Sequence, residues 1–210
     1  MAGQTLSRWA LLPAAVAVYL APQGTQIGRG EPLRDTARVL GAYCHAIVIR
    51  TYGQEIAEEL ARFAPVPVIN GLTDLLHPTQ VLADLMTVAE LHGAQALQPC
   101  APPGVKVQSS AVAAGAGSGG DGGPPGGGAA RFAWIGDGNN MAHSWINAAA
   151  LLGLDLALAF PLGRDPDAEV LARAQRVAAT TGARLTLTHD PSEAAAGRHV
   201  LRSEERRVGK

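Results

Sequence analysis

The tetrapeptide His77-Pro78-Thr79-Gln80 combines side chains that could bind and polarise a small carbonyl compound. A histidine can donate a hydrogen bond to a carbonyl oxygen on which charge develops, and a glutamine can accept one from an amide. Pro78 favours the first turn of a helix, which would begin beside His77 and keep Gln80 within one turn of it. As an isolated motif this is weak, because a lone histidine at a helix start is more often a cap or a surface residue.

Arg50 is a second candidate, because it follows a short apolar run, residues 46–49, that predicts a strand. The carboxyl ends of parallel strands form the ligand-binding edge of an α/β sheet, and His77 follows another predicted strand at that edge. A guanidinium at this edge suits a phosphate or a carboxylate. The alternative is a solvated charge at a strand end, and sequence position alone favours neither interpretation.

A third candidate is the run Gly136-Asp137-Gly138-Asn139-Asn140, which lies between a predicted strand and a predicted helix. This placement predicts backbone N–H groups and a side-chain amide directed at an anion such as an α-carboxylate. The run is similar to a dinucleotide-binding fingerprint but lacks its third glycine, so a nucleotide site is disfavoured.

These candidates require elements that bring strand ends together, and the spacing of apolar residues predicts alternating strands and helices. The first half is predicted to hold strands at residues 16–20, 46–49 and 66–69 and helices at residues 32–43, 54–63 and 79–91. The second half is predicted to hold strands at residues 131–135, 154–160 and 184–188 and helices at residues 139–152 and 167–181. We therefore expect an α/β fold of two doubly wound parallel-sheet lobes, both incomplete.

Helical periodicity also predicts which side chains of two helices face the core. The inward residues expected in helix 79–91 are Val81, Leu82, Leu85, Val88 and Ala89. Those expected in helix 167–181 are Val170, Leu171, Ala174, Val177 and Ala178.

Residues 94–130 interrupt the pattern, because glycine, alanine, proline and serine accumulate there. Such a composition buries too little apolar surface to offset the entropy of ordering, so we predict a flexible linker or an inserted loop. A phosphate-binding loop is disfavoured, since that requires a few glycines between a strand and a helix. The predicted domains are residues 1–93 and 131–201 on either side of this linker.

Composition limits the class of protein. Hydrophobic residues at 47% and charged residues at 17% are typical of a globular chain, and a net charge of -1 argues against nucleic-acid binding. Cys44, Cys100 and the histidines lack metal-ligand spacing, so no metal site is predicted. The apolar residues 9–21 are too short to cross a bilayer and are predicted to lead into a buried strand instead of a signal peptide, so we expect a cytoplasmic protein without a membrane partner.

Three motifs in a fixed order resemble the aspartate/ornithine carbamoyltransferase family. They are residues 26–31 with 35–38, residues 70–74 with residues 77–80, and residues 136–140 with His143-Ser144. The similarity covers residues 16–201 apart from the glycine-rich stretch. It implies two α/β lobes that bind carbamoyl phosphate and an amino acid, an active site between them in a homotrimer, and no metal or organic cofactor.

The resemblance implies a role for each matching residue. Positions that hold carbamoyl phosphate in the family correspond to Gln26, Arg50, His77, Pro78, Thr79 and Gln80, and the asparagine that binds the amino acid corresponds to Asn140. The form Gly-Asp-Gly-Asn-Asn is similar to the ornithine branch. The implied reaction transfers the carbamoyl group to the δ-amino group of ornithine, giving citrulline and phosphate, in arginine biosynthesis or in the reverse, catabolic direction. Arg50 and His77 would be the catalytic residues, at the phosphate and the carbonyl oxygen.

The sequence departs from the family pattern at both ends. Residues 1–15 do not match, and the phosphate-gripping Ser-x-Arg-Thr-Arg loop is absent. The later Asp-x-Trp-x-Ser-Met-Gly and His-Cys-Leu-Pro-Arg segments are absent too, and residues 202–210 read as a foreign tail. We therefore expect a truncated chain that is inactive and poorly soluble. The alternatives are a related transferase for another amine or amino acid and a non-catalytic sensor of carbamoyl phosphate.

Overall fold

The computed structural model describes residues 16–20, 30–99 and 128–204. Its contacts define two compact units. Unit 1 comprises Met1–Ile47 and Glu58–Pro67, and unit 2 comprises Val48–Ala57 and Val68–Lys210.

The strand predicted at residues 16–20 is absent, because these residues have no regular secondary structure. Val16 and Val18 are 93% and 79% exposed, so no burial of apolar surface offsets the cost of ordering a strand there. This sequence prediction is wrong.

Unit 1 contains helix α2 (Leu33–Tyr43) and most of helix α3 (Gln54–Phe63), as the periodicity predicts. Helix α2 buries Thr36 and Ala37. The guanidinium of Arg38 lies 5.7 Å from the centre of the Phe63 ring, which makes a cation–π contact between the two helices.

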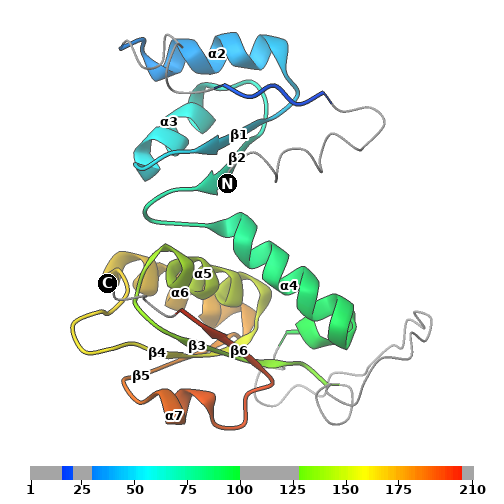
Figure 1. Cartoon of the computed structure of the whole chain (residues 1–210), viewed down its shortest axis with the longest axis vertical. Coiled ribbons are helices and arrows are strands. Elements are labelled where there is room, and N and C mark those ends of the chain that lie inside the picture. The colour runs from blue at the N-terminus through cyan, green and yellow to red at the C-terminus, as the bar shows by residue number, and fades with distance from the viewer. Residues whose placement is uncertain (1–15, 21–29, 100–127, 205–210) are drawn as a thin grey trace, which may run out of the picture. The chain divides into compact units, whose positions relative to one another are not determined.

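Strands β1 (Ile47–Arg50) and β2 (Val68–Leu72) form a two-stranded sheet, and their arrows run in the same direction (Figure 1). Helix α3 connects the two strands, as expected for a parallel pair. Strand β2 begins two residues later than predicted because Pro67 has no N–H for the ladder. At Gly71 a Cβ atom would lie 3.1 Å from the Ile49 carbonyl oxygen, so a glycine permits close approach of the strands.

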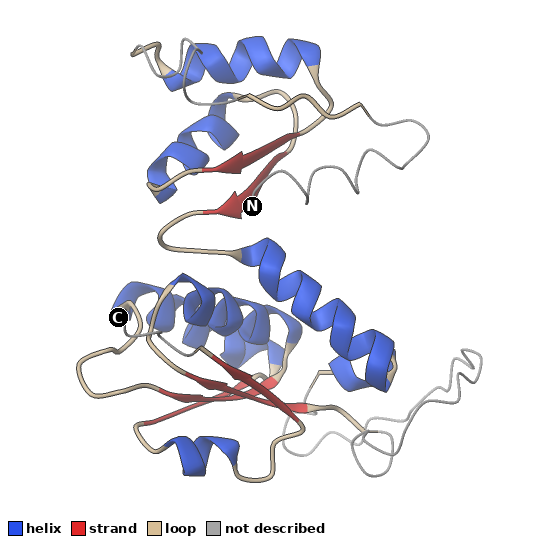
Figure 2. Cartoon of the chain, in the orientation of Figure 1, coloured by secondary structure: helices blue, strands red, loops and turns tan. Residues whose placement is uncertain are grey.

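Unit 2 holds a second, four-stranded parallel sheet in the order β5-β4-β3-β6 (Figure 2). Its strands are β3 (Arg131–Ile135), β4 (Asp155–Ala159), β5 (Arg184–Thr188) and β6 (Val200–Ser203). The fold is therefore α/β with parallel sheets, as predicted. Strand β6 was not predicted, and it pairs Arg202 with Trp134 and Ser203 with Ile135, beyond the predicted end of the lobe at residue 201.

Helices cover both faces of this sheet. Helices α5 (Asn140–Leu152) and α6 (Ala168–Thr181) lie together on one face, and the short helix α7 (Pro191–Ala195) lies on the other (Figure 1). Asn139 and Asp167 cap α5 and α6 by accepting hydrogen bonds from backbone N–H groups. The hydrogen bond from the Val170 N–H is the main reason why the pKa of Asp167 is lowered. Helix α7 was not predicted because five residues show no helical period.

Helix α4 (Pro78–His92) packs against α5. Its buried side chains belong to the hydrophobic core that includes residues of α5, α6, β3 and β4. The predicted inward residues Val81, Leu85 and Val88 are buried, but Leu82 is 58% exposed, so that assignment is wrong. Leu82 lies one helical step of about 100° from Val81, which carries it towards solvent. In α6 the predicted residues Val170, Ala174 and Ala178 are buried, and Leu171 and Val177 pack against the core.

Both ends of the predicted linker are ordered, contrary to expectation. Ala94–Leu97 forms a short 3-10 helix, η2. Ala96 and Ala130 are buried, and the Ala130 N–H donates to the Ala96 carbonyl oxygen at 2.9 Å. Residues 100–127 lie outside the described residues, and the predicted domain boundaries stay predictions. Across the described ranges, none of the helices combines the length and apolar character needed to cross a membrane.

Candidate functional site

His77 immediately precedes α4, which begins at Pro78 as the sequence predicts. The hydroxyl of Thr79 donates to the Gly71 carbonyl oxygen at 3.0 Å and lies 3.3 Å from His77 Nδ1. Because the single hydroxyl hydrogen is given to Gly71, Nδ1 of His77 is the donor to Thr79 in this arrangement. The neutral ring then carries its lone pair on Nε2.

Arg50 ends β1 with an exposed side chain, and it lies close enough to His77 to act on its charge. Partial burial lowers the pKa of His77, the positive charge of Arg50 lowers it further, and the carboxylate of Asp84 acts in the opposite direction. In the structure, two predicted site residues, Arg50 and His77, therefore lie close enough for the charge of Arg50 to affect the protonation of His77.

Gln80 lies in the first turn of α4, where its side-chain Nε2 donates to Asp84 Oδ1 at 3.0 Å. Asp84 Oδ2 in turn lies 3.3 Å from Arg202 Nε on β6. This chain of contacts orients the Gln80 amide and leaves its Oε1 atom as the group that can accept a hydrogen bond from a ligand.

The turn between β2 and α4 contacts the first turns of α5. Asn140 Nδ2 donates to the Thr73 carbonyl oxygen at 2.9 Å, and the His77 N–H donates to Ser144 Oγ at 2.7 Å. Asn140 therefore lies next to the turn that carries His77, and the predicted residues Arg50, His77, Gln80 and Asn140 all belong to unit 2. Gln26 lies outside the described residues.

The glycine run before α5 does not direct all its backbone N–H groups at a ligand. The N–H groups of Gly136, Gly138 and Asn139 donate to the carbonyl oxygens of Ala159, Arg164 and Asp137. Gly138 is required for packing, because a Cβ atom there would overlap the backbone of Asp165 and Pro166. The prediction that backbone N–H groups of this run face an anion is wrong for these three, because their acceptors lie in β4, in the loop after β4 and in the run itself.

His143, Ser144 and Asp84 are site neighbours whose roles the sequence did not indicate. His143 and Ser144 stood in a recognised motif without an assigned function, and Asp84 stood in no motif. The signal that could have found the first two is their spacing, because residues 140, 143 and 144 share one face of a helix.

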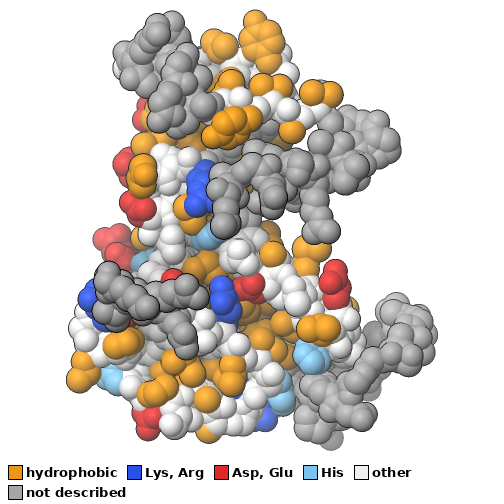
Figure 3. Space-filling model, in the orientation of Figure 1, with side chains coloured by type: hydrophobic (Ala, Val, Ile, Leu, Met, Phe, Trp, Pro, Cys, Tyr) orange, Lys and Arg blue, Asp and Glu red, His pale blue; other side chains and the backbone are white. Residues whose placement is uncertain are grey.

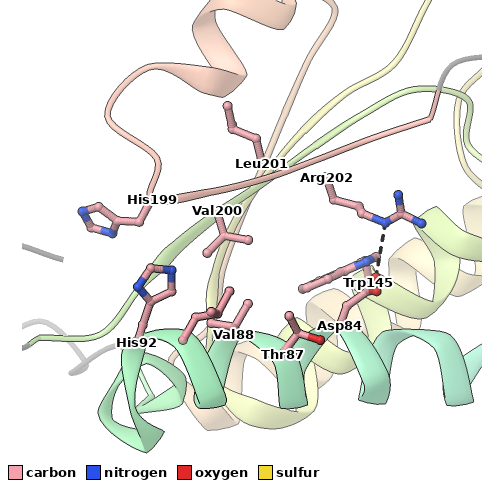
Figure 4. Close-up of a pocket in the computed structure, with 10 residues that line it drawn as sticks. Asp84, Thr87, Val88, His92, Trp145, His199, Val200, Leu201 and Arg202 are labelled. Atoms are coloured by element: carbon pink, nitrogen blue, oxygen red, sulfur yellow. Dashed lines mark hydrogen bonds and ion pairs between the residues drawn. The ribbon is translucent and has the colours of Figure 1, made fainter. Parts of the chain in front are cut away.

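A cavity of about 350 Å³ lies between α4 and β6 (Figure 4). The Asp84–Arg202 ion pair spans one end, and His92 and His199 lie near each other at the other end (Figure 4). No group of three or more potential metal-binding side chains occurs in the part of the chain that the structure describes.

Comparison with known proteins matches both parts of the chain to one family. Residues 12–90 match "Aspartate/ornithine carbamoyltransferase, carbamoyl-P binding domain", and residues 129–205 match "Aspartate/ornithine carbamoyltransferase, Asp/Orn binding domain". The α/β fold with parallel sheets is therefore the fold of this class of proteins. The chain belongs to the aspartate/ornithine carbamoyltransferase family.

The ornithine carbamoyltransferase of Pelobacter propionicus is 49% identical over 187 residues, which are 89% of this chain and 50% of that protein. The enzyme of Geobacter sulfurreducens is 45% identical with the same coverage. The chain thus spans about half the length of the curated relatives it matches.

Solved structures show the same relationship. The ornithine carbamoyltransferase of Pyrococcus furiosus is 35% identical, with a TM-score of 0.70, over 91% of this chain and 51% of that chain. The enzyme of Gloeobacter violaceus is 40% identical, with a TM-score of 0.62, over 82% of this chain and 50% of that chain.

Proposed function

We propose that the protein to which these residues belong transfers the carbamoyl group of carbamoyl phosphate to the δ-amino group of ornithine, giving citrulline and phosphate. The observation that supports this most is the grouping of Arg50, His77 and Gln80 beside Asn140, at the turn between β2 and α4. These residues come from the two segments that match the carbamoyl-P and Asp/Orn binding domains. Arginine biosynthesis and a trimeric parent protein are parts of the same proposal.

In the proposed reaction the phosphate lies near Arg50, whose guanidinium offsets the negative charge that grows as phosphate departs. The carbamoyl NH2 group donates to Gln80 Oε1, which the bond from Nε2 to Asp84 keeps in place. The Thr79 hydroxyl holds the imidazole of His77, and Pro78 sets the start of the helix.

His77 would polarise the carbonyl oxygen of carbamoyl phosphate. Because Nδ1 donates to Thr79, a hydrogen bond from Nε2 requires the imidazolium form. The lowered pKa favours the neutral ring before the ligand arrives, whereas the negative charge of a bound phosphate favours protonation. Ligand binding would therefore raise the pKa of His77.

Asn140 is proposed to hold the backbone of ornithine. One N–H of its amide donates to the Thr73 carbonyl oxygen, and the second N–H together with Oδ1 can form hydrogen bonds with the amino acid. The neutral δ-amino nitrogen would then attack the carbonyl carbon in a near-attack geometry, forming the new C–N bond as the C–O bond to phosphate breaks, and the proton lost from the nitrogen would pass to the departing phosphate.

The 210-residue polypeptide itself is proposed to have little activity. The Ser-x-Arg-Thr-Arg motif is absent from its sequence, and each lost charge-assisted hydrogen bond weakens binding by about 1.5–3 kcal/mol. A citrulline assay on the purified chain should therefore give a rate close to background, and an ordinary rate of citrulline formation would contradict this expectation.

Ligand binding provides the direct test of the site. We expect phosphonoacetamide, a stable analogue of carbamoyl phosphate, to shift the NMR resonances of Arg50, His77 and Gln80 in the purified chain. Arg50→Gln should weaken this binding by about tenfold, because a charged contact to phosphate is lost. The matched control Arg173→Gln changes an exposed arginine on α6 and should leave binding unchanged. Binding that is absent, or equal in both variants, would refute the proposed site.

A further inference from the structure

One face of α5 is bonded to the turn that precedes His77. Asn140, His143 and Ser144 are spaced as neighbours on a helix surface. Their side chains meet the Thr73 carbonyl oxygen, the Leu75 carbonyl oxygen at 3.0 Å and the His77 N–H at 2.7 Å. Three hydrogen bonds from α5 thus fix residues 73, 75 and 77 of the turn.

The contacts of His143 determine the position of its proton. The carbonyl oxygen of Leu75 can only accept a hydrogen bond, so Nδ1 of His143 is the donor. The Asp167 N–H can only donate, so Nε2 accepts from it at 2.9 Å. His143 is 6% exposed and is therefore a buried, neutral imidazole in the Nδ1–H tautomer that links the turn to the start of α6.

The turn itself is internally closed. The Thr73 N–H donates to the Leu76 carbonyl oxygen at 2.8 Å, and the Leu76 N–H donates to Thr73 Oγ1 at 3.0 Å. The Thr73 hydroxyl also donates to Gln54 Oε1 at 2.8 Å, and Thr73 is fully buried. Because these internal hydrogen bonds make the turn move as one unit, the hydrogen bonds from α5 to Leu75 and His77 fix the position of the whole turn.

We propose that His143 and Ser144 are positioning residues that hold His77 in the geometry needed for carbamoyl phosphate, an inference that rests on the proposed function. The Ser144 hydroxyl accepts from the His77 N–H and donates to the Asn140 carbonyl oxygen at 2.7 Å, so it joins the two halves of the site directly. A misplacement of about 1 Å is enough to lower a reaction rate by about a hundredfold.

Two substitutions at one position separate positioning from general stability. His143→Asn places an amide nitrogen near the position of Nδ1 and keeps the donor to Leu75, whereas His143→Gln places an amide oxygen near Nε2 and keeps the acceptor for Asp167. Each variant loses one buried hydrogen bond, so both should be destabilised to a similar extent in urea unfolding. We expect His143→Gln to weaken phosphonoacetamide binding by about tenfold and His143→Asn to bind within about threefold of the original chain.

Ser144→Ala removes the acceptor for the His77 N–H and should also weaken binding by about tenfold, with faster hydrogen exchange at that N–H. The control is Thr181→Val, which removes a hydrogen bond of 2.6 Å from Thr181 Oγ1 to the Ala150 carbonyl oxygen, near the other end of α5. This control should lower stability without changing ligand affinity.

Measurements on the ligand-free chain keep this inference distinct from the proposed function. The NMR resonances of the His77 ring should shift in His143→Gln and Ser144→Ala but stay in place in His143→Asn and Thr181→Val. Equal effects of the two His143 variants, on the His77 resonances or on affinity, would overturn the positioning role. Failure of the original chain to bind phosphonoacetamide would refute the proposed function, and the His77 resonances would still decide the positioning role.

Discussion

The imidazole of His77 lies under opposite electrostatic influences from two neighbours. Burial and the guanidinium of Arg50 lower its pKa, while the carboxylate of Asp84 raises it. Each neighbour also has a second role, since Arg50 is proposed to bind the phosphate and Asp84 accepts a hydrogen bond that orients Gln80. The charge state of His77 is therefore coupled to the groups that would bind carbamoyl phosphate.

At the residue scale, substitutions of these neighbours should move the pKa of His77 in opposite directions. Arg50→Gln should raise it because a repelling positive charge is removed, and Asp84→Asn should lower it because a stabilising negative charge is removed. NMR titration of the His77 ring measures both shifts. Shifts of the same sign in the two variants would be inconsistent with this arrangement.

The lowered pKa also sets the sign of a stability effect. Between the folded pKa of His77 and its unfolded value of about 6.5, the unfolded chain binds more protons than the folded chain. The stability contributed by neutral His77 is thus present above pH 6.5 and is lost as the pH falls towards the folded pKa. His77→Asn should consequently lose less stability than the original chain between about pH 7.5 and pH 5.5 in urea unfolding.

At the element scale, backbone hydrogen bonds connect the segments at one end of the four-stranded sheet, and a shielded ion pair connects those at the other end. After β3, the Gly138 N–H donates to the Arg164 carbonyl oxygen in the loop after β4, and the absence of a side chain at Gly138 permits this close contact. At the opposite end, the carboxylate of Asp155 at the start of β4 is paired with Arg198, which precedes β6. Their side chains are only 11% and 14% exposed, so this ion pair is largely shielded from water.

Arg198→Met should destabilise the chain by about 3 kcal/mol, because it leaves Asp155 as a buried charge without its close partner. Methionine retains the apolar stem, so the loss reports on the charge and not on packing. Arg184→Met is the matched control, since Arg184 is 60% exposed and lies 4.0 Å from the same carboxylate. It should cost under about 1 kcal/mol in urea unfolding, and equal losses in the two variants would contradict the assignment.

At the scale of the whole molecule, many large hydrophobic side chains remain exposed in the described part of the chain, and Figure 3 shows several on one face. Leu201 on β6 is 58% exposed, and among the described strands β6 pairs with β3 alone. An exposed apolar strand at the end of a sheet favours pairing with other molecules.

We therefore expect the 210-residue chain to self-associate, and Leu201→Lys to reduce that association by placing a charge on β6. Light scattering during size-exclusion chromatography measures the change in mass. Leu162→Lys is the control, because Leu162 is 82% exposed in a loop outside the strands. If Leu162→Lys reduced self-association as much as Leu201→Lys, net charge and not the exposed strand would control solubility.

The sequence by itself determined the elements that have a clear periodicity of apolar residues or a residue that marks the start of a helix. Helix α3 and strands β3 and β5 lie at the predicted residues, and α4 begins at Pro78, because periodic burial and proline act locally. The family followed from motifs that each occupy a few consecutive residues. The strand predicted at residues 16–20 failed because apolar composition alone does not provide a partner.

Only the tertiary structure decided how the site residues are held. Asn140, His143 and Ser144 contact residues 67 or 68 positions earlier in the chain, and no local pattern reports such a contact. The same holds for the N–H groups of Gly136 and Gly138, which the local sequence predicts to face an anion but which donate to the carbonyl oxygens of Ala159 and Arg164. Hydrogen-bond partners are set by which elements pack together, so the proton position on His143 became definite only when α5, α6 and the turn before α4 met.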